Sequence, residues 1–253
     1  MARLIYYYQT PSTLDGVADG YVYVSALHFT EDGGIHLNDQ PADQQPGLWA
    51  DVEAAAARGV TTMVMLGGAG GAFTELFRHF ERNFGLLVDL LRARPYIRGI
   101  DLDVEEECAL QDVRMLINRL DQEFGAGFLI TMAPVQAALE SDQPGMGGFS
   151  YGDLRDTLEG RRVDWFNAQC YGDYTSDAYA RIVANGYAAD RVVFGVDGDA
   201  YPDDAAEQVR AAAERYDDFG GVFLWEYGDT GVPPLRWGED MRNAMRQRWW
   251  WWW

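Results

Sequence analysis

The chain has 253 residues, 48% of them hydrophobic, and this length fits one α/β barrel better than two ordinary domains. Its 40 acidic residues outnumber its 20 basic ones, which are all arginine, and give a net charge of −20. So acidic a chain argues against nucleic acid or an anionic membrane as a partner and is compatible with a neutral substrate such as a sugar. No apolar run approaches the length of a membrane span.

Short β-rich or apolar runs that end at turn residues predict strands, and apolar residues at helical spacing predict helices. In chain order, we expect strands at 3–9, 21–29, 61–66, 99–105, 128–132, 163–169, 191–196 and 221–225. Helices are expected at 48–58, 73–94, 110–124, 151–158, 177–185, 204–216 and 238–248. This alternation predicts a single-domain α/β fold, a (β/α)8 TIM barrel over residues 1–248, with strand 99–105 as its fourth. A doubly wound open sheet is the alternative, but it would need a switch-point phosphate loop, and none is convincing.

The two ends of the chain carry separate expectations. The five tryptophans at 249–253 resemble no folding element, and we read them as an artefact or an unstructured tail. The first strand begins almost at Met1, which leaves no room for a signal peptide. We therefore expect an intracellular chain or a mature secreted one, and favour the secreted form.

The stretch 99–105, GIDLDVE, carries the candidate chemistry. Alternate side chains of a strand point to opposite faces, so the acids share one face and the aliphatic residues the other: Asp101, Asp103 and Glu105 against Ile100, Leu102 and Val104. Neighbouring acids have Cα atoms about 6–7 Å apart, so they repel, which raises the pKa of at least one and couples their titration. The alternative is a solvated edge strand, but the aliphatic opposite face favours burial.

The remaining motifs do not predict a cofactor or a metal. The glycine cluster at 67–71 lacks the Lys-Ser/Thr ending of a P-loop and the GxGxxG spacing, so it predicts a tight turn or close backbone approach. His28, His36 and His79 fall on different elements without shared spacing. Cys108 and Cys170 have no metal-type spacing, and free buried thiols are expected.

The run 98–105 resembles the DGxDxDxE signature of family 18 glycoside hydrolases, the chitinases and their relatives. Further segments are similar to other elements of that family. They are 64–68 (SxGG, with Met65 at the serine position), 132–134 (MAP), 169–171 (QxY) and 221–225 (GGVMxW). The chain between the strands near Val192 and Val222 leaves no room for the α+β domain that some members insert. The resemblance therefore implies a compact barrel with a shallow cleft.

The resemblance also implies roles for individual residues. Glu105 would be the general acid, and the substrate's own N-acetyl oxygen would be the nucleophile, giving an oxazolinium intermediate. Asp103 would orient the acetamido group and offset the developing positive charge, and Asp101 would share a proton beneath it. Tyr171 would donate its hydroxyl to the acetamido carbonyl, and Trp225 would form an apolar floor for the sugar. The remaining substrate-binding candidates are Gln169, Met132, Tyr6 and Gln9.

Two positions depart from the family pattern. Arg98 stands where the first Asp of the signature is expected, and Gly172 stands where an Asn usually follows the tyrosine of QxY. An arginine near Asp101 would lower the pKa of that carboxyl.

The predicted function is that of a retaining glycosidase acting on β-1,4-linked N-acetylglucosamine polymers, chitin or chitooligosaccharides, by substrate-assisted catalysis. The alternatives are an endo-β-N-acetylglucosaminidase acting on N-glycans and a non-catalytic sugar-binding barrel. Sugar-binding members of the family commonly lose the general acid, so the presence of Glu105 favours catalysis. The expected partner is an N-acetylglucosamine-containing saccharide, with no cofactor or metal, and a monomer is expected. Exo or endo action stays open.

Overall fold

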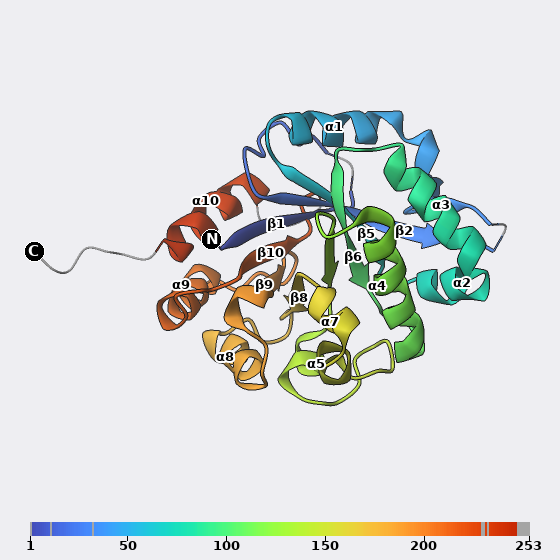
Figure 1. Cartoon of the computed structure of the whole chain (residues 1–253). Helices are drawn as coiled ribbons and strands as arrows, with labels where there is room; N and C mark the ends of the chain where they lie inside the picture. The colour runs from blue at the N-terminus through green and yellow to red at the C-terminus, as the bar shows by residue number, and fades with distance from the viewer. Residues whose placement is uncertain (1, 11, 32, 229–230, 232, 247–253) are drawn as a thin grey trace, which may run out of the picture.

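Eight parallel strands close into a barrel in the computed structural model, which describes residues 2–10, 12–31, 33–228, 231 and 233–246 (Figure 1). Around the barrel the strands are β1 (Arg3–Tyr8), β2 (Tyr21–Phe29), β5 (Thr61–Gly67), β6 (Ile97–Asp103), β7 (Leu129–Met132), β8 (Trp165–Gln169), β9 (Val192–Asp197) and β10 (Gly221–Trp225). A parallel β1–β2 pairing closes the ring. The predicted TIM barrel is confirmed, with the acidic strand β6 as the fourth. The predicted tail at 249–253 lies outside the described residues.

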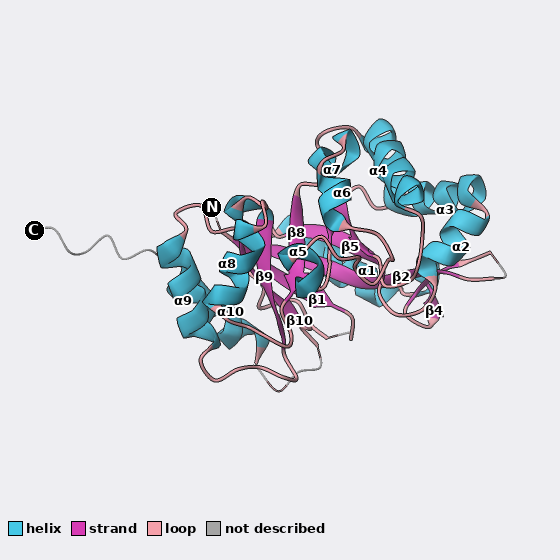
Figure 2. Ribbon diagram, turned by 90° about the horizontal axis from the view of Figure 1, so that it is seen from below, coloured by secondary structure: helices cyan, strands magenta, loops and turns pink. Residues whose placement is uncertain are grey.

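Helices surround the strands in Figure 1, and the view at right angles in Figure 2 shows them on both sides of the barrel. They are α1 (Pro46–Ala57), α2 (Ala72–Arg78), α3 (Phe80–Arg92), α4 (Leu110–Phe124), α5 (Gln136–Glu140), α6 (Tyr151–Arg155), α7 (Leu158–Arg162), α8 (Ser176–Ala184), α9 (Ala205–Arg215) and α10 (Pro234–Met245), with 3-10 turns η1 (Ala42–Gln44) and η2 (Ala189–Arg191). In the described part of the chain, none of these helices is long and apolar enough to cross a membrane.

Helix α4 shows how the sequence sets these elements. Val113, Leu116, Ile117 and Leu120 recur at helical spacing, and all four side chains are buried in the core. The helix ends at Gly125, whose φ of 75° lies in a region that favours glycine. The predicted bounds 110–124 match the helix.

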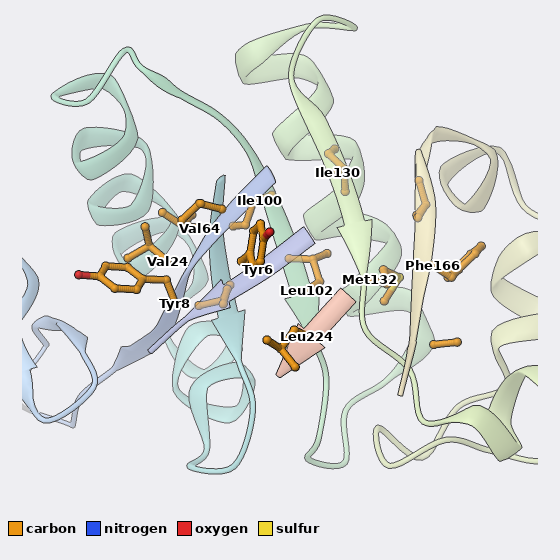
Figure 3. Close-up of a cluster of buried hydrophobic side chains, with 14 of the residues drawn as sticks. Tyr6, Tyr8, Val24, Val64, Ile100, Leu102, Ile130, Met132, Phe166 and Leu224 are labelled. Carbon is orange, nitrogen blue, oxygen red and sulfur yellow. The ribbon is translucent and has the colours of Figure 1, made fainter. Parts of the chain in front are cut away.

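Side-chain alternation divides the barrel strands into an outer and an inner layer. Outward-facing side chains join the core beneath the helices, and Figure 3 labels several of them: Tyr6, Tyr8, Val24, Val64, Ile100, Leu102, Ile130, Met132, Phe166 and Leu224. Inward-facing side chains form a separate cluster inside the barrel: Ile5, Tyr7, Tyr23, Ala26, Met63, Met65, Trp165, Val193 and Phe223. The acids of β6 therefore lie on the inner layer, opposite the aliphatic residues of the same strand.

The structure differs from the predicted elements in several places. The helix expected over 151–158 is divided into α6 and α7, and β6 ends at Asp103, two residues before the predicted end of that strand. The helix expected over 73–94 is interrupted at His79, whose φ of −136° and ψ of 55° are not helical, and the Asn83 amide donates to the Glu75 carbonyl across the break. A hairpin of β3 (Ile35–Leu37) and β4 (Gln40–Pro41) extends β2 antiparallel, where the sequence predicted a loop. The short helix α5 was also not predicted.

The charge excess predicts that salt stabilises this fold. At a net charge of −20 the surface acids repel one another, and the Debye length falls from about 10 Å at 0.1 M salt to about 3 Å at 1 M. We expect the melting temperature at pH 7 to rise between 0.1 and 1 M NaCl. The control is the same comparison near the isoelectric point of about 4.3, where the rise should largely disappear. A fall at pH 7, or an equal rise at both pH values, would contradict this explanation.

Candidate active site

The acids of β6 form a row from the barrel centre to its carboxyl end. Asp101 is fully buried, Asp103 is 5% exposed, and Glu105 lies two residues beyond the end of the strand and is partly exposed. Ile100 and Leu102 pack outward beneath the helices. The strand therefore presents three carboxyl groups in order of increasing contact with water.

Asp101 is held by three neutral donors from three other strands. The Tyr7 hydroxyl donates to its Oδ2 over 2.6 Å, and the Asn167 amide donates to its Oδ1 over 2.9 Å. The Thr131 hydroxyl donates to the same Oδ1. The carboxylate thus exchanges its water for hydrogen bonds within the barrel, as a buried acid requires.

Burial raises the pKa values of all three acids, and repulsion from its neighbours raises that of Asp103 further. Burial raises the pKa of Asp101 to about 6, against the lowering effect of its three hydrogen bonds. Asp103 has a pKa well above its usual range because of burial and of the charges on Glu105 and Asp101. Burial also raises the pKa of Glu105, opposed by the nearby Gln169 amide. The expected repulsion is therefore present at Asp103, and it favours a proton held within the row.

Arg98 does not lie near this row, so the predicted effect on Asp101 is wrong. Its side chain is exposed and lines a shallow cavity with Leu91, Pro95 and Phe128. Arg98 lies at the start of β6, and a register shift between Ile97 and Ile100 separates it from the regular alternation that carries Asp101. No arginine contributes to the raised pKa of Asp101.

A cavity of about 230 Å³ opens above the acids at the carboxyl ends of the strands. Its lining residues are Gln9, Ala26, His28, Met65, Gly67, Gly68, Ala69, Asp103, Glu105, Gln169, Tyr171 and Trp225. The structure thus brings together Glu105, Tyr171 and Trp225, which are far apart in the sequence. The active sites of TIM barrels lie at this end.

Gln169 links the acids to the neighbouring strand. Its Nε2 donates to Asp103 Oδ1 over 3.1 Å and to the Ala133 carbonyl over 2.7 Å. Because an amide nitrogen has two hydrogens, both bonds form at once. Gln169 therefore fixes one carboxylate oxygen of Asp103 and leaves the other toward the Gly68 side of the cavity, where an added Cβ would lie 3.7 Å from it.

Two predicted binding residues lie outside this cavity, because both face outward. Tyr6 packs edge-on against Tyr227 and Trp237 under α10, with ring centroids 5.6 and 5.4 Å away. Met132 is fully buried in the outer core (Figure 3). On β1 the tyrosine that faces the acids is Tyr7, one residue further along, and the prediction of Tyr6 was wrong by this one step of register.

Several lining residues were not predicted. His28 lies near the carboxyl end of β2 and lines the cavity. Its Nδ1 and Nε2 lie 3.3 and 3.2 Å from the carbonyl oxygens of Ala26 and Ala69. Met65 lies opposite Asp101 in the β5–β6 register and is nearly fully buried. Met65 stands at the serine position of the SxGG element, which was a signal for it. His28 belongs to no motif, and its only signal was its place near the carboxyl end of β2.

The glycine cluster makes the tight turn that the sequence predicted. Gly67 has a φ of 106°, and a Cβ there would lie 2.1 Å from the Asp103 carbonyl oxygen. The Gly68 amide donates to that same oxygen over 2.8 Å. Glu106 accepts from the amides of Phe73 and Thr74 at the start of α2. The turn and the segment after β6 are therefore fixed against each other beside the acids.

A buried glutamate fixes the opposite wall. The Glu226 carboxylate accepts from the backbone amides of Gln9 and Thr10 over 2.8 and 2.9 Å, and from the Thr10 hydroxyl over 2.6 Å. Glu226 follows Trp225 directly. These bonds tie the segment after β1 to the end of β10, so Gln9 and Trp225 are held side by side.

A larger cavity, of about 610 Å³, opens at the opposite end of the barrel. It is lined by Arg3, Gly20, Thr61 and Arg242 among others, and none of the acid row reaches it. Within the described ranges, no group of three or more His, Cys, Asp or Glu side chains is arranged to hold a metal ion. The expectation of a metal-free site stays a prediction.

Comparison with known proteins decides the family. No family model matches the chain. A fungal endo-β-N-acetylglucosaminidase from glycosyl hydrolase family 18 is 32% identical, with a TM-score of 0.87 over 97% of this chain and 99% of that one. The chain belongs to glycoside hydrolase family 18. Chitinase ChiC from Aspergillus fumigatus is also 32% identical, with a TM-score of 0.81 over 97% of this chain and 100% of that one.

Membership of family 18 confirms the predicted enzyme class, a glycosidase, at the level of the family. Chitinase 2 of Rhizopus oligosporus is 25% identical in a 210-residue alignment that covers 72% of this chain. The family 18 chain spans 36% of the length of that relative.

The burial of Asp101 predicts a pH-dependent stability for this family 18 barrel. Its pKa of about 6 exceeds the value of about 3.9 in an unfolded chain, so its stabilising contribution is complete below about pH 4 and is lost as the pH rises through 6. A difference of about two pH units corresponds to about 3 kcal/mol. Urea unfolding of the native protein and of Asp101→Asn at pH 4 and pH 7 measures it. The loss between these pH values should be about 3 kcal/mol smaller in the variant, and equal losses would contradict the assignment.

The position of Trp225 predicts a role in sugar binding. The indole lies at the cavity wall, 5.5 Å from the Tyr7 ring, and offers a rigid apolar surface. Trp225→Ala should weaken binding of a chitooligosaccharide by about 1–3 kcal/mol, the scale of a lost aromatic contact. Calorimetric titration checks this, with Tyr201→Ala as a control at a partly buried aromatic outside the cavity. Unchanged affinity in folded Trp225→Ala would remove Trp225 from the binding surface.

Proposed function

We propose that this protein is a retaining glycosidase that hydrolyses β-1,4-linked N-acetylglucosamine polymers by substrate-assisted catalysis. The observation that carries the proposal is the distribution of carboxyl groups around the cavity. Among the described residues that line the cavity, those with carboxyl groups are Asp103 and Glu105, which are two positions apart in the sequence and lie on one wall. The facing wall carries Trp225 and Gln9. A glycosidase with its own nucleophile places two carboxylates on either side of the scissile bond.

This arrangement supports the N-acetyl group of the substrate as the nucleophile. Its carbonyl oxygen attacks the anomeric carbon and the glycosidic bond breaks, giving an oxazolinium ion that water then opens with retention. Glu105 protonates the departing oxygen. Its raised pKa supports this role, because a general acid must hold its proton near the working pH.

The two aspartates act on the acetamido group. The pKa values of Asp101 and Asp103 support one proton and one negative charge held between them. That charge lies beneath the cavity and offsets the positive charge of the oxazolinium. Asp103, at the cavity floor, orients the acetamido group, and Tyr171 donates its hydroxyl to the acetamido oxygen. Burial and the charge on Asp103 raise the pKa of Tyr171 well above 10, so it keeps its proton.

The named relatives support this substrate class. The named relatives include chitinases, and one structurally similar chitinase catalytic domain, at 14% identity, was solved with penta-N-acetylchitooctaose. Such a polymer does not cross a membrane unaided, so we place the activity outside the cell.

Cleavage of the core of N-linked glycans is the second candidate. It is favoured by the TM-score of 0.87 to the fungal endo-β-N-acetylglucosaminidase. Product analysis on chitin oligomers beside an N-glycoprotein separates the two. We expect short N-acetylglucosamine oligomers from the first substrate and an intact glycan on the second. Release of the glycan alone would favour the second candidate, and the absence of both products would favour a sugar-binding barrel.

The separate roles of the acids predict different responses to the leaving group. Glu105→Gln has no proton to give and should lose about 10²–10⁴ in rate on chitin oligomers while keeping sugar binding. Asp103→Asn should also lose rate. Its amide can still form a hydrogen bond, but it cannot share with Asp101 the negative charge that offsets the oxazolinium. An activated aryl glycoside needs little protonation, so it should partly rescue Glu105→Gln and do much less for Asp103→Asn. Steady-state rates on both substrates measure this.

Two results would count against these roles. An equal response of the two variants to the aryl glycoside would show that the acids do not act separately. Full activity of Glu105→Gln on chitin oligomers would remove the general acid from the proposal. Circular dichroism of both variants is the control for folding.

A further inference from the structure

The amide of Asn167 is fixed at both ends inside the barrel. Its Nδ2 donates to Asp101 Oδ1 over 2.9 Å, and its Oδ1 accepts from the Trp165 indole over 3.0 Å. An indole N–H only donates, and an ionised carboxylate only accepts. Turning the amide over would set donor against donor at one end and acceptor against acceptor at the other, so a single orientation satisfies both partners.

Trp165 is itself held in place from below. The Arg3 guanidinium lies 4.1 Å from its ring centroid, and the Tyr21 ring packs edge-on at 5.4 Å. The Trp165 side chain is 2% exposed and Asn167 is fully buried. Both polar atoms of the amide thus have a partner within the barrel.

The other two donors to Asp101 differ from Asn167 in one respect. The hydroxyls of Tyr7 and Thr131 can rotate and accept a hydrogen bond instead of donating one. The Asn167 amide cannot do this while the indole occupies its oxygen. Oδ1 of Asp101 therefore always receives an N–H, which favours the ionised carboxyl, whereas the hydroxyls of Tyr7 and Thr131 can turn to accept from a proton bound at either oxygen.

We propose that Asn167, oriented by Trp165, is a positioning residue that keeps the negative charge of the acid pair on Asp101 down to mildly acidic pH. The inference rests on the proposed function, in which that charge offsets the oxazolinium. The Asn167 amide sets the pH at which the pair of Asp101 and Asp103 takes up a second proton. Below that pH the pair has lost its negative charge.

The surroundings of Asp101 leave few other groups to perform this task. The titratable side chains that face it are Tyr7 from β1, Tyr23 from β2 and Asp103 from its own strand. The inner layer contributes Met65 from β5, Thr131 from β7, Val193 from β9 and Phe223 from β10, none of which carries a charge. Since these neighbours supply no cation, hydrogen bonds alone favour the ionised carboxyl.

The test is the pH profile of kcat/KM. Asn167→Leu keeps the branched shape of the side chain and removes the fixed donor, so the acid limb should move to higher pH by about one pH unit, the scale of one hydrogen bond to a charged group. Trp165→Phe keeps a ring on Arg3 and frees the amide oxygen, and the limb should move in the same direction by less. Thr62→Val is the matched control, because it loses a buried hydrogen bond on β5 without touching Asp101. It should lose stability with an unmoved limb.

A titration that does not depend on activity separates this inference from the proposed function. In ¹³C-carboxyl NMR of the whole protein, the Asp101 signal is identified by its absence in Asp101→Asn, and its midpoint should rise in Asn167→Leu. If Asn167→Leu does not fold, Asn167→Ser replaces it, because a serine hydroxyl can turn its hydrogen away. An unmoved or lowered midpoint in the folded variant, or an acid limb equally moved in Thr62→Val, would overturn the proposal, even if the wild-type protein hydrolyses no sugar.

Discussion

The site depends on one constraint, the burial of a carboxyl group at the centre of a barrel that offers it hydrogen bonds but no cation. Tyr7, Thr131 and Asn167 satisfy Asp101 with neutral donors, which offsets only part of the cost of burying a charge. The remainder appears as a raised pKa, and Asp103 above it is affected more strongly because it also meets the charges of its neighbours. A row of acids in this environment holds protons near neutral pH, which a row on the surface would not do.

The barrel supplies this environment through its geometry. Inward side chains of parallel strands meet in layers, so donors from β1, β7 and β8 reach one oxygen pair on β6 although they are distant in the sequence. The carboxyl ends then open into the cavity. There the segments between strands are fixed by carboxylates that take no part in the row: Glu106 holds the start of α2, and Glu226 holds the segment after β1. Chemistry and positioning are thus divided between acids that are close in space.

Much of this could be predicted from the sequence, because period-two alternation fixes which residues of a strand share a face. The eight strands, the placement of Asp101 and Asp103 and the meeting of Tyr171 with Trp225 follow from alternation together with the family motifs. The absolute facing of a strand does not follow when both faces are apolar. On β1 the run Tyr6–Tyr7–Tyr8 reads the same in either register, so the sequence does not distinguish Tyr6 from Tyr7, which is the one that faces the acids. Partners across the barrel, such as Asn167, carry no local signal at all.

The arginines complete the argument about charge. Arg98, which stands at the first acidic position of the motif, lies outside the barrel, and Arg3 approaches the interior only as far as the Trp165 ring. Between that ring and Asp101 stands the Asn167 amide, which passes on a hydrogen bond but no charge. If a guanidinium reached Asp101 directly, its carboxyl would stay ionised far into the acid range and could not exchange a proton with Asp103. A neutral relay keeps the two carboxyls close enough in proton affinity to share one proton, which an ion pair would prevent.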